Sequence, residues 1–233
     1  MIKTIFTLLF LCSVSGLLYA QDTINVYYDN NWVEIPNKAE AVFYRKAYQE
    51  GKNVWTVHDY YISNKIQMTG AYNSKKFTKK NGHFTYYAEN GNKTSEGNYV
   101  DDKLMGPWNY WFETGEKKSA GEYSDNAKWG VWNYWYANGQ LQSKETFKKA
   151  GNGSFEGYHE NGVMSVKGNT VNDLPEGIWM YWNSDGRKIL EGNFNHGIRD
   201  GEWTRTFRDG EMKLFFKNGL ISGKLRGGIV RNE

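Results

Sequence analysis

Cysteine, proline and an excess of one charge are the features this sequence has little of. Its one cysteine, Cys12, lies in the apolar first twenty residues, so the rest of the chain has no disulfide, thiol nucleophile or thiolate metal ligand. Only 3 prolines accompany 26 glycines, and the glycines lack the three-residue period of collagen. The 29 basic and 26 acidic side chains are interleaved, which argues against a dedicated nucleic-acid surface.

Long apolar runs are also missing beyond the N-terminus. Lys3 precedes the run IFTLLFLCSVSGLLYA, a layout typical of a signal peptide over residues 1–20, with cleavage after Ala20. A lipoprotein signal centred on Cys12 is the alternative. We therefore expect an exported protein, whether periplasmic, on the outer surface or secreted, and about 213 remaining residues suffice for a folded core.

Aromatic residues are abundant, at 17%, which argues against disorder, and they recur with glycine in a regular pattern. A Gly-x-aromatic signal begins at Gly82, and the next five copies follow at spacings of 24, 24, 23, 24 and 24 residues. These copies start at Gly106, Gly130, Gly153, Gly177 and Gly201. Nine residues after each leading glycine stands another: Gly91, Gly115, Gly139, Gly162, Gly186 and Gly210. Four of the second-position aromatics are tryptophans, Trp108, Trp132, Trp179 and Trp203, and we assign both sets a structural role in the repeat.

Each copy has the pattern of a β-hairpin. An aromatic run such as WNYWF is followed by a break such as ENG or ETG, which suits either a type I′ turn or a type I turn with a glycine bulge. The return turns between hairpins carry Asp102, Asn126, Asp173 and Gly197, all tolerant of a left-handed backbone. With a two-residue loop, we expect Trp108 to lie over Gly121 and Trp179 over Gly192; a three-residue loop would remove this pairing.

The flanking segments complete the array. Residues 55–81 are interpreted as a degenerate repeat and connector, residues 21–54 as an N-terminal β cap, and residues 220–233 as a C-terminal edge strand or tail. The fold class expected is all-β, an elongated, twisted antiparallel meander of six to seven hairpins, with six full repeats over residues 82–219.

With these motifs in view, the chain resembles MORN-repeat proteins, specifically the secreted bacterial MORN-variant family of Bacteroidetes type. The segment EGNFNHGIRDGEW follows the family pattern, and EGNYVDDKLMGPW and AGEYSDNAKWGVW repeat it. The resemblance implies a twisted sheet of hairpins that acts as an interaction or scaffold module, sometimes at membranes. Relatives of the bacterial variant carry an antitoxin-like name, so a toxin partner is one alternative.

Aromatic residues at the fifth position of the repeat are the candidate binding residues. They point away from those at positions two and four, because side chains alternate along a strand. This set is Tyr87, Trp111, Trp135, Tyr158 and Trp182. They form either an exposed stacking platform for a surface glycan or extended peptide, or a purely structural ladder; the repeat spacing favours the structural interpretation.

No chemistry beyond binding is indicated. The four histidines occupy different phases of the repeat, and we expect no metal, cofactor or catalytic residue. An enzyme would need acids from different repeats, such as Asp173, Glu176 and Glu160. Lys144, Lys148 and Lys149 are interpreted as a solvated sheet edge, with weak membrane contact as the alternative. The sequence predicts a non-enzymatic interaction or scaffold protein whose partner is a protein or a glycan.

Overall fold

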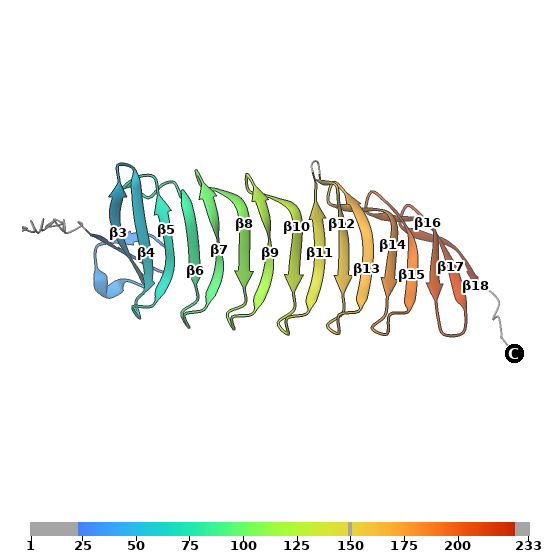
Figure 1. Ribbon diagram of the computed structural model, residues 1–233. Helices are drawn as coiled ribbons and strands as arrows, with labels where there is room; N and C mark the ends of the chain where they lie inside the picture. Colours follow the sequence, from blue (N-terminus) through green and yellow to red (C-terminus); the bar gives the residue numbers. More distant parts are fainter. Residues whose placement is uncertain (1–22, 149–150, 227–233) are drawn as a thin grey trace, which may run out of the picture.

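The computed structural model describes residues 23–148 and 151–226, and these form one open antiparallel sheet (Figure 1). The sheet has 18 strands, and one short 3-10 helix, η1 (Lys38–Glu40), lies before β3. The predicted all-β hairpin meander is confirmed. The predicted signal peptide lies outside the described residues, as does Lys149 of the lysine cluster.

The strands have the following bounds. The first nine are β1 (Ile24–Tyr28), β2 (Glu34–Ile35), β3 (Phe43–Gly51), β4 (Val54–Tyr61), β5 (Ile66–Tyr72), β6 (Gly82–Tyr87), β7 (Lys93–Val100), β8 (Lys103–Trp111) and β9 (Lys117–Ser124). The others are β10 (Ala127–Trp135), β11 (Leu141–Phe147), β12 (Gly153–Tyr158), β13 (Met164–Val171), β14 (Leu174–Trp182), β15 (Lys188–Asn195), β16 (Ile198–Thr206), β17 (Glu211–Lys217) and β18 (Leu220–Arg226).

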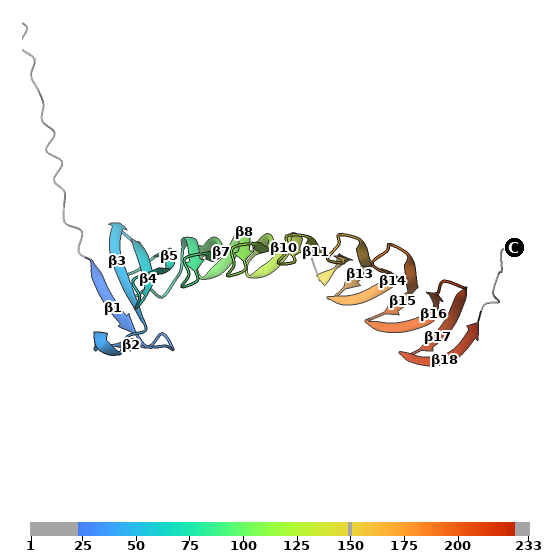
Figure 2. The same ribbon diagram turned by 90° about the horizontal axis from the view of Figure 1, so that it is seen from below.

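The order of strands follows the chain from β3 to β18, so nearly every neighbour in the sheet is also a neighbour in sequence. At the N-terminal end β1 pairs with both β2 and β3. Figure 2 shows β1 and β2 lying across this end of the row, and it shows the sheet twisting toward β18.

The first strands form a capped end with a small core. Ala47, Val57 and Met68 are buried here, and the Arg45 guanidinium forms a two-pronged ion pair with Asp59, at 2.7 and 2.8 Å. Arg45 also lies 5.1 Å from the ring centroid of Phe77 in the loop after β5. A buried ion pair with both partners hydrogen-bonded closes the end of the array without leaving a buried charge unpaired.

Two kinds of turn alternate along the array. At the return turns both central residues have positive φ, as at Asp101 (49°) and Asp102 (67°), which is the type I′ geometry expected of these residue types. At the other end, the Gly91 N–H donates to the Ala88 carbonyl and the Ala88 N–H to the Asn92 carbonyl, both at 2.9 Å. With Gly91 at a φ of 94°, this is the type I turn with a glycine bulge, the second of the two predicted options.

The predicted pairing of aromatics with glycines is confirmed, with one correction. Trp108 pairs with Gly121 although the loop is not a two-residue turn, because a second irregularity between Tyr110 and Trp111 restores the register. The ring that covers Gly121, however, is Trp132 of the following hairpin: a Cβ at Gly121 would lie 2.3 Å from it. The glycine is therefore a contact between repeats, not within one.

Candidate functional site: a tyrosine-lined groove on the tryptophan face

One face of the sheet, here called the tryptophan face, carries the aromatics at positions two and four of the repeat. The second-position rings other than the half-buried Phe155 are buried although a single sheet forms them, with Trp132 at 1% exposure and Trp203 at 0%. They are covered by other rings: Tyr99 lies 5.1 Å from Trp108, and Tyr123 lies 4.9 Å from Trp132, both edge-on. Edge-to-face pairs at these centroid distances are favourable. The rings thus form a packed ladder that needs no ligand to cover it.

The indole nitrogens fix the ladder to the backbone. The Trp108 Nε1–H donates to the Asn98 carbonyl at 3.1 Å, and the Trp132 Nε1–H donates to the Glu122 carbonyl at 2.9 Å. Trp179 and Trp203 make the same bond at 3.0 Å to Asn169 and Asn193. Each acceptor lies in the preceding hairpin, one residue after the glycine that the ring covers. Tryptophan at this position therefore both packs against and hydrogen-bonds the previous repeat.

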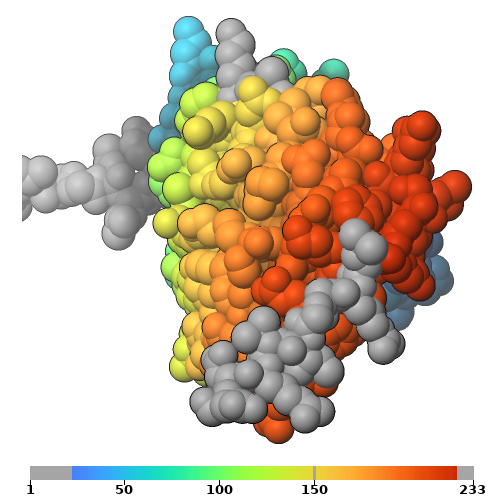
Figure 3. Space-filling view, turned by 90° about the vertical axis from the view of Figure 1, so that its right-hand side faces the viewer, coloured from blue at the N-terminus to red at the C-terminus, as the bar shows by residue number. Residues whose placement is uncertain are grey.

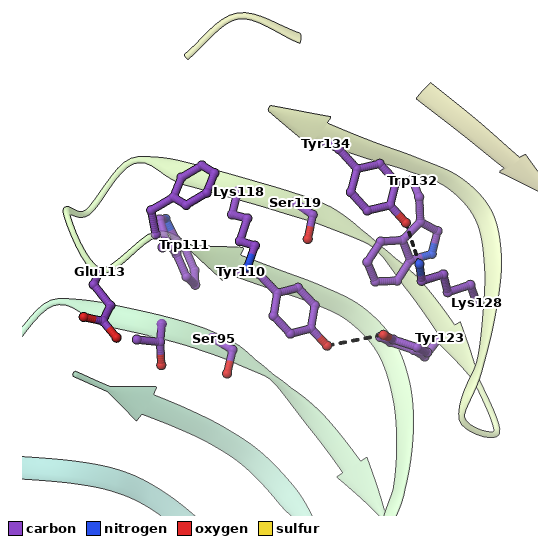
Figure 4. Close-up of a pocket in the computed structure, with 12 residues that line it drawn as sticks. Ser95, Tyr110, Trp111, Glu113, Lys118, Ser119, Tyr123, Lys128, Trp132 and Tyr134 are labelled. Atoms are coloured by element: carbon purple, nitrogen blue, oxygen red, sulfur yellow. Dashed lines mark hydrogen bonds between the residues drawn. The ribbon is translucent and has the colours of Figure 1, made fainter. Parts of the chain in front are cut away.

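An open groove of about 670 Å³ crosses β7 to β10 on this face. Figure 4 shows the Tyr110 and Tyr123 hydroxyls facing each other and the Tyr134 hydroxyl directed at Lys128. Ser119 lies between Tyr110 and Tyr134, and Ser95 lies on the other side of Tyr110. We call it the tyrosine groove. Its full lining is Thr94, Ser95, Tyr110, Trp111, Phe112, Glu113, Lys118, Ser119, Tyr123, Lys128, Trp132 and Tyr134.

The groove offers neutral hydroxyls, the Glu113 carboxylate and two ring-held cations, one of which is Lys118, 5.7 Å from the Phe112 ring centroid. The Tyr110 hydroxyl donates to the Tyr123 hydroxyl at 3.3 Å. The Lys128 ammonium donates to the Tyr134 hydroxyl and lies 4.9 Å from the Trp132 ring centroid. Burial raises the pKa of both Tyr110 and Tyr134, so these phenols stay neutral donors and acceptors well above neutral pH. Such a surface suits stacking and hydrogen bonding, not proton transfer.

The five predicted binding residues are half-buried. In the described part of the chain, none of their rings contacts another aromatic ring, unlike the rings of the tryptophan face. Instead, Lys93 lies 5.6 Å from the Trp111 ring centroid and Lys117 lies 5.5 Å from that of Trp135. Trp111 is also one of the residues that line the tyrosine groove. Their role in binding stays a prediction.

The acids considered for catalysis are not brought together. Glu160 lies at the turn before β13, whereas Asp173 and Glu176 follow that strand. Eight residues of extended chain separate the two ends by about 25 Å. The Glu176 carboxylate instead accepts the backbone N–H of His196 at 2.7 Å. Within residues 23–148 and 151–226, no three His, Cys, Asp or Glu side chains cluster as metal ligands would.

Lys144 is not at a sheet edge, contrary to the sequence interpretation. It lies in β11, which pairs with β10 on one side and β12 on the other. Its neighbours in the sheet are Asn133 and Glu156. A lysine can therefore lie in a central strand, and the sequence alone does not distinguish that position from one in an edge strand.

The groove-lining tyrosines were not singled out from sequence. A signal for them exists: position four is tyrosine at Tyr86, Tyr110, Tyr134 and Tyr181, and position thirteen is serine in the first three repeats. Alternating faces place both positions on the tryptophan side. What the pattern does not show is that the rings leave a groove between them.

The comparison with known families agrees with this geometry. The model of the MORN repeat variant matches residues 80–101 and 130–149. Both segments are thus similar to MORN repeats. The first match spans the β6–β7 hairpin, and the second takes in β10 from Gly130 onward and all of β11, so each match corresponds to one hairpin. No curated protein sequence matches the chain. In the described ranges the structure has no helix with the length and apolarity needed to cross a bilayer.

Proposed function

We propose that this chain is a MORN-repeat protein and an exported, non-enzymatic interaction module that holds an extended segment of a partner protein in the tyrosine groove. The tyrosine groove is the observation that carries the proposal. It combines aromatic walls, neutral hydroxyls and the Lys128 ammonium in an open channel across successive hairpins. Exposed aromatic surface of this kind is typical of a contact site.

Two further features support a binding role. MORN repeats generally serve as protein- or membrane-interaction modules. In addition, the ladder below the groove is packed by its own rings and indole hydrogen bonds, so the groove is formed before any partner arrives. Binding to a preformed surface avoids the entropic cost of ordering it.

A glycan partner is the second candidate, favoured by one observation. The rings of Tyr87, Trp111, Trp135, Tyr158 and Trp182 have no ring–ring partners in the described residues, so a sugar ring has aromatic surface to stack on. The resemblance to secreted bacterial variants with antitoxin-like names adds a toxin protein as a further alternative, and that partner would occupy the same surfaces.

A photo-crosslinking experiment tests the proposal. The photoreactive amino acid p-benzoyl-phenylalanine replaces Tyr134 in the groove, and in a matched variant it replaces Asn133, the preceding residue, which faces the opposite side. We expect a discrete crosslinked protein band from Tyr134 and none from Asn133. Equal crosslinking at both positions, or none at either, contradicts the groove as the protein-binding site.

Two measurements test the proposed export and the choice of a protein over a glycan partner. When the protein is purified from its own cells, N-terminal sequencing should show that it begins at Gln21; an uncleaved N-terminus contradicts export. Titration with surface glycans should leave tryptophan fluorescence unchanged. Quenching that disappears in Trp135→Ala but persists in Tyr134→Phe would replace the protein partner with a glycan.

A further inference from the structure

The last two hairpins carry different residues at the groove-forming positions of the repeat. Arg205 occupies position four, where Tyr110 and Tyr134 stand in the tyrosine groove. Leu190 and Leu214 occupy position thirteen, where Ser95 and Ser119 stand. A second open groove, of about 660 Å³, lies here, and we call it the arginine groove. Figure 3 views the molecule from this end, with β15 to β18 in orange and red.

Arginine dominates the charge of this groove. Its lining is Arg187, Ile189, Leu190, Arg199, Arg205, Thr206, Phe207, Arg208, Asp209 and Leu214. Four guanidinium groups thus face one carboxylate. In the part of the chain that the structure describes, none of the four arginines forms an ion pair, although Lys188 and Lys213 on the same hairpins do.

Two of these guanidiniums are held on aromatic rings. The Arg199 guanidinium carbon lies 4.6 Å from the Trp203 ring centroid, and that of Arg205 lies 5.1 Å from the Phe207 ring centroid. Stacking on a ring restricts the guanidinium plane and leaves its edge N–H groups available to a second ligand. The arginines are therefore oriented without being neutralised.

A change in register explains why the groove differs. The Phe207 N–H donates to the Gly210 carbonyl at 2.8 Å, which closes β16 and β17 with a shorter turn than in the other repeats. Consequently Trp203 pairs with Leu214, and Phe216 pairs with Gly201. In the other hairpins the partner of the second-position aromatic lies two residues later in the repeat, as in Trp179 with Gly192. The shift places Leu214 opposite Trp203 and Met212 opposite Arg205. Leu190 pairs with Arg205 in the ordinary register, as Ser95 does with Tyr110.

We propose that the arginine groove binds an acidic peptide segment in which carboxylates alternate with apolar side chains. This deepens the proposed function, on which it rests, by assigning the chemistry of the partner at one end of the array. Carboxylates match the geometry of guanidinium edges, and apolar side chains match Ile189, Leu190 and Leu214. Cations and apolar side chains line the same groove, so its ligand must carry both carboxylates and apolar groups.

Charge complementarity selects this occupant over a polyanion. A phosphate-rich polymer or an anionic membrane surface would pair the arginines but leave the leucines and Phe207 without apolar contact, and it would meet the Asp209 carboxylate. A peptide of mixed character covers both parts of the lining. It also extends naturally along the same face toward the repeats with tyrosine at position four.

Fluorescence anisotropy with a labelled peptide of alternating glutamate and leucine tests this inference on the full chain. The substitutions Arg205→Tyr and Leu190→Ser introduce the residues that other repeats hold at these positions, so the fold is expected to persist. We expect each to weaken peptide binding about tenfold or more, as removal of a charge-assisted hydrogen bond or a buried leucine contact does. Lys213→Gln, which removes a charge from the opposite face of the same hairpin, is the matched control and should leave the affinity unchanged.

The controls separate the alternatives. The peptide with glutamine in place of glutamate should not bind; equal binding overturns the assignment of a carboxylate ligand. Binding to phosphatidylglycerol vesicles or inorganic polyphosphate that exceeds peptide binding and is lost in Arg205→Tyr also overturns it, in favour of a phosphate ligand. If the acidic peptide does not bind while Tyr134 still crosslinks a protein, this inference fails and the proposed function stands. If the acidic peptide does not bind and Tyr134 crosslinks no protein, both this inference and the proposed function fail.

Discussion

Two halves of the repeat array use the same scaffold but differ along the tryptophan face. From β6 to β10 the rings run without a break from Phe84 to Tyr134, and from β12 to β17 they run from Phe155 to Phe216. In the described residues no ring contact joins the halves. The strands β11 and β12 still pair, so the backbone is continuous where the ladder is not.

Two residues that face each other and depart from the repeat pattern explain the break in the ladder of rings. Glu145 stands where a glycine is covered by the next ring in most other repeats, and its partner Phe155 stands where tryptophan is usual. Burial raises the pKa of the Glu145 carboxyl, with the Lys128 ammonium acting in the opposite direction. The smaller ring leaves room for the extra side chain. Turn glycines and strand pairing therefore determine the scaffold, whereas single side chains on the tryptophan face determine what that face can bind.

The largest expected effect comes from removing one buried ring in each half. Trp132→Ala and Trp203→Ala should each lower the free energy of unfolding by about 3–5 kcal/mol, because a buried tryptophan leaves a cavity. Hydrogen exchange should place the loss mainly in β8–β11 for the first and in β14–β17 for the second, since the ladder is interrupted at Glu145. Equal loss of protection across both halves would show that the array is one cooperative unit.

The next effect concerns glycines that a ring covers. Gly121→Ala should cost about 1–3 kcal/mol, because the added Cβ lies 2.3 Å from the buried Trp132 ring. Gly130→Ala is the matched control: no atom lies within 4 Å of its added Cβ, and only its φ of 66° is strained. That strain costs about 1 kcal/mol. Urea unfolding of both variants gives the difference, and a costlier Gly130→Ala would mean that backbone strain dominates.

Joining the two ladders tests the comparison directly. The double variant Glu145→Gly with Phe155→Trp should raise the free energy of unfolding by about 1 kcal/mol, the contribution of a restored aromatic contact. Phe155→Trp alone should destabilise, because the Glu145 side chain occupies the space that the indole needs. A double-mutant cycle measured by urea unfolding supplies the coupling. Additive effects would show that the two positions do not share that space.

The smallest effect is alkaline destabilisation. Burial raises the folded-state pKa of Tyr110 and Tyr134, while an unfolded tyrosine ionises near about pH 10. Above that pH the folded state keeps more protons than the unfolded state, so stability should fall as pH rises. Melting temperatures by circular dichroism at increasing pH measure this. Tyr110→Phe should flatten the decline; an unchanged decline would assign the effect to other groups.

The hairpin count and the turn residues could be read from the sequence because they depend on local backbone conformation. Asp102, Asn126 and Gly197 adopt positive φ wherever the chain reverses, and this requirement is carried by the residues themselves. The predicted pairing of Trp108 with Gly121 also held, since both lie in one hairpin. The choice between the two turn types at Gly91 did not follow from sequence, because both accept Asn-Gly.

What only the tertiary structure decided is which side chains meet across repeats. That Trp132 covers Gly121, and that Trp132 donates to the Glu122 carbonyl, depends on the bulge between the adjacent strands β9 and β10. The tyrosine and arginine grooves likewise depend on how strands of successive hairpins pair and twist. The sequence by itself determined a MORN-like array of hairpins with aromatic faces, because period and turn chemistry are local. It did not determine the grooves, because a groove is the space left between side chains after strands have taken their register.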